Sequence, residues 1–348
     1  MHAPAMRFTL TLLAVFALVG LGAGPALADD GDVAWTVRTA SNSYGADRSS
    51  FSYAVNPGGQ VNDAMVVANR GKTPLDLAVY AADGFTTDTG QVDLLVKDKK
   101  SVGVGVFLHA DRDKFAIKPG QSVSIPFTMA VPSNATPGDY VGGIVTSLTQ
   151  AAGTESINVE RRLGIMVKLR VSGQLNPALA VEDFHVDYAG TFNPFAKGDA
   201  TVSYRIHNTG NTILSAQQSV SVSGPLGWLR TAAGKVEAPP QLFPGESWKV
   251  SVPVAGVAPA VRVAATVSLS PLLTDPSGST SALDPVEATA HGTAVPWTLL
   301  VVLVVLIAVV LGAVYLMRRN RAKRKIREDA RVQEAIDQAL RDQKAKTS

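Results

Sequence analysis

The sequence contains no cysteine among its 348 residues. This absence excludes disulfide bonds, thiol catalysis and cysteine-based metal sites. Charge is also sparse, since charged residues make up 18% of the chain and the formal net charge is +3. With 46% hydrophobic residues, the chain is no disordered polyelectrolyte, and it is long enough to bury more than one core. We therefore expect two folded units that are held together by packing alone.

Residues that carry metal or catalytic chemistry are scarce as well. The five histidines show no pair with the short spacing of a zinc site, and the chain lacks the G-x-S-x-G, H-E-x-x-H and P-loop motifs. His109 lies beside two acids in "HADRD", residues 109–113, a pattern that is typical of a polar hairpin tip. The sequence therefore predicts a protein that is not an enzyme and that uses no cofactor and no metal.

Two apolar segments predict export and a membrane anchor. Residues 1–28 show an early cation, an apolar stretch and small residues before two aspartates, which is the order of a secretory signal peptide. An uncleaved anchor helix is the alternative, and it would export the following residues too. Residues 295–317 are uncharged and, as a helix, long enough to span a bilayer core of about 30 Å.

The residues after this apolar run carry the basic charge. Residues 318–348 hold 11 Lys and Arg against 5 Asp and Glu, so the positive-inside rule places this tail in the cytoplasm and residues 29–294 outside. Apolar residues from Val332 to Leu340 suggest an amphipathic helix, which is either a solvated tail or a partner-binding helix. An anionic inner leaflet accounts for the cations, so we expect no nucleic-acid partner.

The exported part shows the two-residue alternation of strands. It recurs in "SVSIPFTMAV", "RRLGIMVKLRV" and "DATVSYRIH", and the runs are separated by Gly, Pro, Asn and Asp. This pattern is typical of antiparallel sandwiches with short connections. We predict a mainly β protein with two immunoglobulin-like β-sandwich domains, one C-terminal transmembrane helix and a short cytoplasmic helical tail.

One strand–turn–strand pattern occurs twice. Its copies are "NRGKTPLDL", residues 69–77, and "NTGNTILSA", residues 208–216. Asn and Gly tolerate positive φ, so we predict structural turns at Asn69 and Gly71 and at Asn208 and Gly210. Pro-Gly pairs also precede strands and predict tight turns; they are Pro57-Gly58, Pro119-Gly120 and Pro244-Gly245.

The repeated pattern and the changes in composition set the expected domain borders. Residues 274–294 are rich in Ser, Thr, Pro and Gly and poor in large apolar residues, which indicates a flexible stalk. The expected segments are a signal peptide (1–28), a first sandwich (33–172), a second sandwich (175–273), the stalk (274–294), a transmembrane helix (295–317) and a basic cytoplasmic tail (318–348).

The order of these signals resembles the DUF916 family, the peptidoglycan-binding-domain class of WxL-interacting proteins. The resemblance rests on "FSYAVNPGGQVNDAMVVANRGKTPLDLAVYAADGFTTDTGQVDL", "FAIKPGQSVSIPFTMAVPSNATPGDYVGGIVTS" and "RRLGIMVKLRVSG". It implies a membrane-anchored extracytoplasmic protein without enzymatic activity, whose first domain binds the cell wall and whose second binds a partner. The chain is heavy in Ala, Val, Gly and Arg, as high-GC coding produces, which departs from the low-GC bacteria that carry WxL proteins. We therefore expect an actinobacterial type with a wall or surface partner other than a WxL protein.

The loop "AADGFTTDTGQVD", residues 81–93, is the main candidate for ligand binding. Sugar recognition needs a flat apolar face and planar hydrogen-bonding groups, which Phe85, Thr86, Asp83 and Asp88 can offer. The alternative is a long turn whose Asp side chains bond its own backbone and whose Phe enters the sandwich. Tyr140 completes the candidate ligand-binding set.

Further residues have structural interpretations. Gly142 and Gly143 follow Tyr140 in a predicted strand, where paired glycines indicate a bulge or the close approach of another segment. Trp228 in "PLGWLR" and Trp248 in "GESWKV" are either core anchors or surface platforms, and we expect them in the core because aromatic residues mostly fill sandwich interiors.

Together these patterns predict a non-enzymatic, single-pass membrane protein that binds a cell-wall polymer (peptidoglycan), a surface protein, or both. An accessory subunit of a membrane transport or cell-envelope complex is the alternative, and a sandwich-fold glycan hydrolase is a further one.

Overall fold

The computed structural model describes residues 34–152, 157–193, 196–274 and 279–346. These residues form two compact units. Unit 1 holds the described residues up to Pro177 with residues 210–213, 274 and 279, whereas unit 2 holds residues 178–209, 214–273 and those from Thr280 onward. The predicted signal peptide, residues 1–28, lies outside the described residues.

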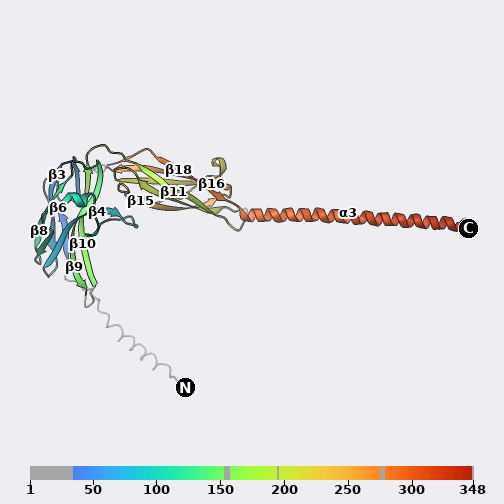
Figure 1. The fold of residues 1–348 in the computed structure, drawn as a ribbon, viewed down its shortest axis with the longest axis horizontal. Coiled ribbons are helices and arrows are strands. Elements are labelled where there is room, and N and C mark those ends of the chain that lie inside the picture. Colours follow the sequence, from blue (N-terminus) through green and yellow to red (C-terminus); the bar gives the residue numbers. More distant parts are fainter. Residues whose placement is uncertain (1–33, 153–156, 194–195, 275–278, 347–348) are drawn as a thin grey trace, which may run out of the picture. The chain divides into compact units, whose positions relative to one another are not determined.

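Unit 1 consists of ten strands and one short helix, all labelled in chain order. They are β1 (Trp35–Thr39), β2 (Phe51–Val55), β3 (Gln60–Asn69), β4 (Leu75–Thr86), β5 (Val92–Leu94), α2 (Val104–Phe107), β6 (Leu108–Ala110), β7 (Lys114–Ile117), β8 (Ser122–Ala130), β9 (Gly138–Ala152) and β10 (Ile157–Val171). One sheet has the order β1-β3-β8-β6 and the other the order β2-β10-β9-β4-β5, with β7 paired to β4. Figure 1 labels β3, β6 and β8 of the first sheet and β4, β9 and β10 of the second. All pairings are antiparallel except that of β2 with β10.

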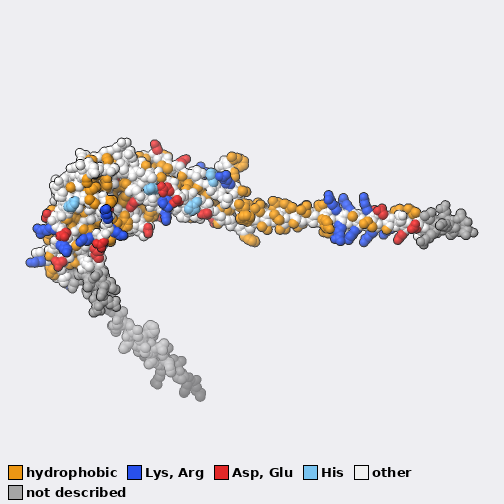
Figure 2. Space-filling model, viewed as in Figure 1, with side chains coloured by type: hydrophobic (Ala, Val, Ile, Leu, Met, Phe, Trp, Pro, Cys, Tyr) orange, Lys and Arg blue, Asp and Glu red, His pale blue; other side chains and the backbone are white. Residues whose placement is uncertain are grey.

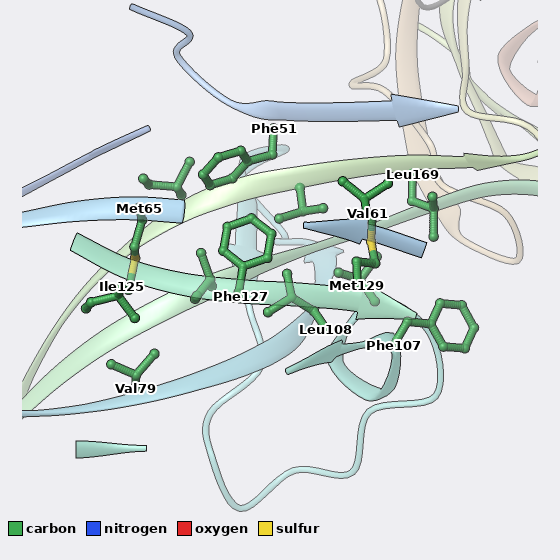
Figure 3. Close-up of a cluster of buried hydrophobic side chains, with 14 of the residues drawn as sticks. Phe51, Val61, Met65, Val79, Phe107, Leu108, Ile125, Phe127, Met129 and Leu169 are labelled. Carbon is green, nitrogen blue, oxygen red and sulfur yellow. The ribbon is translucent and has the colours of Figure 1, made fainter. Parts of the chain in front are cut away.

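The core of unit 1 lies between its two sheets. Alternation turns Val61, Met65 and Val67 of β3 inward, where each is less than a tenth exposed. From the facing strands, the Phe51 ring meets the Phe127 ring edge-on at 5.0 Å (Figure 3). This apolar interior, built without any disulfide, stabilises the unit.

Unit 2 is a second sandwich followed by a long helix. Its elements are β11 (Leu179–Ala189), β12 (Gly198–Asn208), β13 (Leu214–Ser223), η1 (Pro225–Gly227), β14 (Thr231–Ala232), β15 (Ser247–Val257), β16 (Val261–Thr274), β17 (Thr280–Ala282), β18 (Val286–Ala294) and α3 (Trp297–Lys346). One sheet has the order β11-β12-β15 and the other the order β14-β13-β16-β17, with β18 also paired to β16. The predicted fold class, mainly β with two immunoglobulin-like sandwiches and one C-terminal apolar helix, is confirmed.

The repeated sequence pattern corresponds to a repeated structure built on a buried asparagine. Asn69 ends β3, and its Nδ2 donates to the carbonyl oxygens of Thr73 and Ile117 at 2.8 and 3.0 Å. Asn208 ends β12, and its Nδ2 donates to Leu242 O at 2.9 Å. In both copies the Asn carbonyl also accepts the N–H of a Pro-Gly glycine, Gly120 in unit 1 and Gly245 in unit 2. Each Asn thus joins two turns to the end of one strand.

The expected backbone of these turns is only partly found. The Pro-Gly glycines do have positive φ, at +80° for Gly58, +70° for Gly120 and +81° for Gly245. Gly71 and Gly210 are not among the described residues with positive φ. At the first copy the physical reason is visible, because Asn69 Oδ1 accepts the N–H of Gly71 at 2.9 Å. This Asx turn needs no left-handed residue.

The flexible stalk expected at residues 274–294 is not found in its described part. Residues 280–282 form β17, and residues 286–294 form β18, which pairs with β16 from Leu269↔Val286 to Val261↔Ala294. The segment "VEATAHGTA" has the small Ala, Thr and Gly side chains that are typical of a linker. Its residues nevertheless alternate between half-buried and exposed, and its backbone pairs with the neighbouring strand. Only residues 295 and 296 separate β18 from α3.

The C-terminal helix and the two tryptophans differ from expectation in detail. Helix α3 runs unbroken from Trp297 to Lys346, so the apolar run and the basic tail share one helix. It is the one described helix that is long and apolar enough to cross a membrane. Trp248 packs partly buried against the core of unit 2, as expected, but Trp228 is 71% exposed, so its placement in the core is wrong.

Candidate functional site

Asp83 lies in β4 and holds a neighbouring loop to that strand. Its Oδ2 accepts the backbone N–H groups of Val102 and Gly103 at 2.6 and 2.9 Å, and its Oδ1 accepts that of Gly105 at 2.8 Å. The N–H of Asp83 in turn donates to Ser101 Oγ at 3.0 Å. Hydrogen bonds to an ionised carboxylate are the stronger ones. Asp83 therefore anchors the loop of residues 95–107, in line with the alternative that acids of this region bond the chain's own backbone.

Tyr140 packs on the same loop from β9. Its ring lies 5.5 Å from the Phe107 ring at an angle of 62°, and its hydroxyl donates to Thr136 O at 2.9 Å. A Cβ at Gly103 would stand 3.0 Å from Tyr140 Cδ1 and 3.3 Å from Asp83 Oδ1. The structure thus brings Asp83 and Tyr140 together on two sides of Gly103, with the polar groups of both bonded within the protein.

The paired glycines of β9 permit this packing. Pairing of β9 with β4 and β10 continues through Gly142 and Gly143 without a shift of register, so there is no bulge at this position. A Cβ at Gly142 would lie 2.5 Å from Val104 Cβ, and one at Gly143 would lie 2.4 Å from Leu94 Cδ1. The close approach that the glycines indicated is therefore the approach of α2 and β5 to this strand.

Phe85, Thr86 and Asp88 lie at the hairpin between β4 and β5. Phe85 pairs with Asp93 and Thr86 with Val92, and Phe85 is 37% exposed. Asp88 is exposed in the turn that follows, whose glycine Gly90 has φ +79°. The predicted ligand-binding set therefore divides, because Asp83 and Tyr140 meet at Gly103 whereas Phe85 and Asp88 face solvent at the hairpin.

The loop anchored by Asp83 presents a surface that the sequence patterns did not single out. Val102 is 78% exposed, although an apolar side chain of this size is usually covered. Leu95 N–H donates to Asp83 O at 2.9 Å, which holds the first part of the loop beside β4. We name this region the 85–106 surface and define it by four exposed apolar residues, Phe85, Val96, Val102 and Val106, and by its exposed charges, Lys97, Lys99 and Lys100 together with Asp88, Asp93 and Asp98.

A buried polar cluster around Asp63 also escaped prediction. Its carboxylate Oδ2 accepts Arg48 Nη1 at 2.8 Å and the Tyr53 hydroxyl at 2.6 Å. Its Oδ1 accepts Asn42 Nδ2 at 2.5 Å and the Ala64 N–H at 2.7 Å. The Asp63 side chain is fully buried. With this many donors the carboxylate is saturated, so the cluster holds the loop between β1 and β2 and offers no free group for catalysis.

The electrostatics of this cluster follow from the contacts. Burial alone would raise the pKa of Asp63, but hydrogen bonds from Arg48 and Tyr53 outweigh burial and lower the pKa below its ordinary value. Burial, helped by the Asp63 carboxylate, raises the pKa of Tyr53, and the hydrogen bond to Asp63 raises that of Arg48. All three groups therefore keep their usual charge at neutral pH.

Over the described ranges, no group of three or more His, Cys, Asp or Glu residues could hold a metal ion. His109 lies exposed in β6, with its Nδ1 3.3 Å from Phe107 O. Within the described ranges, the pKa shifts of titratable residues arise from burial and from structural contacts such as those around Asp63.

Comparison with known proteins yields structural likeness only. No family model matches the chain, and no curated protein matches it. Among solved structures, a chain from a chaperone–tip adhesin complex of CFA/I fimbriae is 10% identical and has a TM-score of 0.37, covering 74% of this chain and 98% of its own. The class 5 fimbriae chaperone CfaA is 12% identical with a TM-score of 0.35, covering 73% and 98%. The Escherichia coli chaperone DraB is 13% identical with a TM-score of 0.30, covering 73% and 98%.

The chain's own fold defines its class. It is an immunoglobulin-like β-sandwich protein of two units that carries a C-terminal apolar helix. On unit 1 it presents the 85–106 surface, held in place by the Asp83 carboxylate.

Proposed function

We propose that this chain is a non-enzymatic, membrane-anchored extracytoplasmic protein that binds a surface protein through unit 1. The observation that carries the proposal is the 85–106 surface, where exposed valines stand beside three lysines on a loop anchored by Asp83. Exposed apolar residues next to charged ones mark interaction sites on soluble domains. A loop fixed to a rigid strand loses little conformational freedom on binding, which favours affinity.

The chemistry of the surface favours a protein over a sugar polymer. Its exposed apolar groups are mostly branched aliphatic side chains, whereas sugars are recognised by flat aromatic faces. Tyr140, the other aromatic residue of the predicted set, packs its ring on Phe107. A partner with apolar side chains and charges of both signs fits the valines and the mixed charges of this surface best.

Peptidoglycan binding is a second candidate, which one observation favours. Phe85 stays 37% exposed at the β4–β5 hairpin, and the polar residues Thr86 and Asp88 lie in the same hairpin. These groups could contact one face of a sugar ring and its hydroxyls. This candidate requires Phe85, whereas the protein-binding proposal depends mainly on Val102 and Val106.

The full chain in nanodiscs would distinguish the two candidates. We expect V102D/V106D to weaken binding to a captured and identified envelope protein at least about tenfold, because each buried Val contributes about 1.5 kcal/mol or more. A130D, at an exposed position of β8 in the other sheet, should leave binding unchanged. Sedimentation with purified cell wall, lost on F85A but kept in V102D/V106D, would instead support the wall. Equal binding of the envelope protein and of the cell wall by all variants would contradict both candidates. Copurification of the full chain with a multi-span membrane complex would favour an accessory subunit.

A further inference from the structure

Three loops of unit 2 lie at the end of the sandwich from which the chain enters α3. They are residues 190–193 with 196–197, residues 224–230, and residues 258–262, and we name them the helix-proximal loops. Strand register places them together, since Gly198 pairs with Val257 and Val261 pairs with Ala294, the last residue of β18. A Cβ at Gly224 would lie 3.2 Å from Ala260 Cβ, which links the second loop to the third.

A cleft joins the first and third loops to the start of α3. It is lined by Tyr188 and Phe192 of the first loop region, Pro259 of the third loop and Trp297 of the helix. Only residues 295 and 296 lie between β18 and Trp297, so the end of the sandwich stays within about 11 Å of the helix start. The helix-proximal loops and the first turn of α3 therefore form one continuous surface.

This surface is apolar and open. Phe192 is 94% exposed, Leu226 is 89% exposed, and Trp228, Leu229, Val261 and Trp297 are each more than half exposed. Figure 2 shows hydrophobic side chains gathered at the end of unit 2 from which α3 starts. Such a concentration of large apolar groups marks a contact surface, since a single sandwich domain usually keeps such side chains covered.

The charges of the loops are of one sign. Each loop ends in an exposed cation, Lys197, Arg230 or Arg262, and the described residues of the three loops include no Asp or Glu. Asp199, just beyond the first loop, accepts the Gly256 N–H at 3.2 Å. Aromatic and aliphatic residues flanked by Lys and Arg are the composition of a membrane interface, where rings lie among headgroups and cations meet lipid phosphates.

The backbone of these loops is strained at three of the exposed apolar residues. Leu226, Leu229 and Val261 have φ values of 59°, 54° and 61°. The left-handed region is unfavourable for non-glycine residues and most of all for a β-branched one such as Val261. Strained backbone tends to persist at functional positions. Exposed Leu and Val at such positions are hard to explain by packing within unit 2.

We propose that the helix-proximal loops insert into the headgroup layer of the bilayer that α3 spans, so that unit 2 rests on the membrane. The inference relies on the membrane anchoring proposed above. The headgroup layer is about 5–7 Å deep on each side of the bilayer core, and the short connection to Trp297 keeps the loops within reach of it. The bilayer is the partner that the Trp, Phe and Leu side chains and the three cations jointly fit.

The absence of cysteine permits a direct test with the full chain in vesicles of phosphatidylethanolamine and phosphatidylglycerol. Single-cysteine variants L226C and W228C carry an environment-sensitive fluorophore, and the vesicles hold a lipid with a nitroxide close to its headgroup. T209C is the matched control, because Thr209 is exposed at the opposite end of β12 in the same unit. We expect the lipid nitroxide to quench the labels at 226 and 228 several-fold more strongly than the label at 209.

A label at V305C, inside the apolar part of α3, separates this inference from the anchoring proposal when a second set of vesicles holds a lipid with its nitroxide deep in the acyl chain. Strong quenching at 305 by the deep nitroxide, with labels at 226 and 228 as aqueous as that at 209, would overturn membrane contact by the loops and leave the anchor standing. Weak quenching at 305 by the deep nitroxide would overturn the anchor itself. Because Leu226 and Trp228 are both exposed, their replacement leaves the core intact, and circular dichroism of each variant checks this.

Discussion

At the scale of single residues, Asp63 shows how one buried charge organises a loop. It lies between the inward-facing Val61 and Met65 of β3, so its carboxylate enters the sandwich at a core position. A buried carboxylate is tolerated only when it is paired and hydrogen-bonded. Arg48 and Tyr53 meet that condition and thereby tie the segment between β1 and β2 to the sheet.

The lowered pKa of Asp63 predicts acid sensitivity of unit 1. The folded-state pKa lies below the unfolded value of about 3.9. The ion pair with Arg48 therefore contributes stability above that unfolded value, and the contribution is lost as pH falls through the folded pKa. Calorimetry of the full chain from neutral to acid pH should show a steep acid limb for the unit 1 transition.

Replacing the carboxylate gives the matched comparison. D63N leaves the Arg48 guanidinium buried without its counter-charge, so we expect a loss of about 3–5 kcal/mol at neutral pH. The same variant should show a shallower acid limb than the wild type, because the titrating group is gone. Parallel acid limbs in the two proteins would show that Asp63 does not titrate as its contacts imply.

The sequence predicts only part of what the buried acid of β3 and the paired glycines of β9 do in the structure. The acid at a core-facing position of "VNDAMVVA" is a visible signal of a buried charge, but its partners Arg48 and Tyr53 are set by the loop's path. Gly142 and Gly143 indicated either a bulge, which the continuous pairing excludes, or a close approach, which is found. The residues that approach, Val104 and Leu94, lie far away in the sequence, so short-range patterns could not identify them.

At the scale of elements, the repeated asparagine explains why one turn pattern occurs twice. In each unit the Asn side chain closes the end of a strand against carbonyl oxygens of other segments, Ile117 O in unit 1 and Leu242 O in unit 2. Both side chains are buried, so their hydrogen bonds form away from competing water. What the two units share is therefore the hydrogen bonding of a buried Asn side chain at the end of a strand.

Removal of either amide should destabilise its own unit. N69A removes the amide donor to Thr73 O and Ile117 O, and N208A removes the amide donor to Leu242 O, which still accepts the Leu214 N–H at 3.1 Å. Each lost hydrogen bond costs about 0.5–1.5 kcal/mol. We expect a lower melting temperature for the calorimetric transition of the altered unit. G71A is the control, because Gly71 does not have positive φ, so alanine meets no left-handed backbone there. A G71A effect as large as that of N69A would contradict the Asx-turn interpretation.

Elements were predicted well where hydrophobic alternation was strong and poorly where side chains were small. The alternating runs of β8, β10 and β12 predict strands directly. The run "VEATAHGTA" has the composition of a linker, because its Ala and Thr residues add little hydrophobicity even though they pair with β16. The anchoring of residues 101–105 by Asp83 was hidden for another reason, since it depends on a contact across about twenty residues.

At the scale of the whole molecule, the charge distribution sets the expected orientation. Residues 318–348 hold 11 Lys and Arg against 5 Asp and Glu, and they continue the same helix that contains the apolar run. A polybasic segment directly after an apolar helix stays on the cytoplasmic side. The sandwiches, which precede that helix, would then lie outside the cytoplasm.

Cysteine-scanning gives a direct measurement of this orientation, because the natural chain contains no competing thiol. Thr209, exposed at the end of β12, and Gln343, in the basic tail, are changed singly to cysteine in cells that express the full chain. A membrane-impermeant maleimide should label T209C on spheroplasts with intact membranes, whereas Q343C should react only after permeabilisation, because the tail's cations hold it at the anionic inner leaflet. V305C, within the apolar segment, should resist the aqueous reagent under both conditions. Labelling of Q343C on intact spheroplasts with protection of T209C would reverse the proposed orientation, and labelling of all three would mean that α3 does not span the membrane.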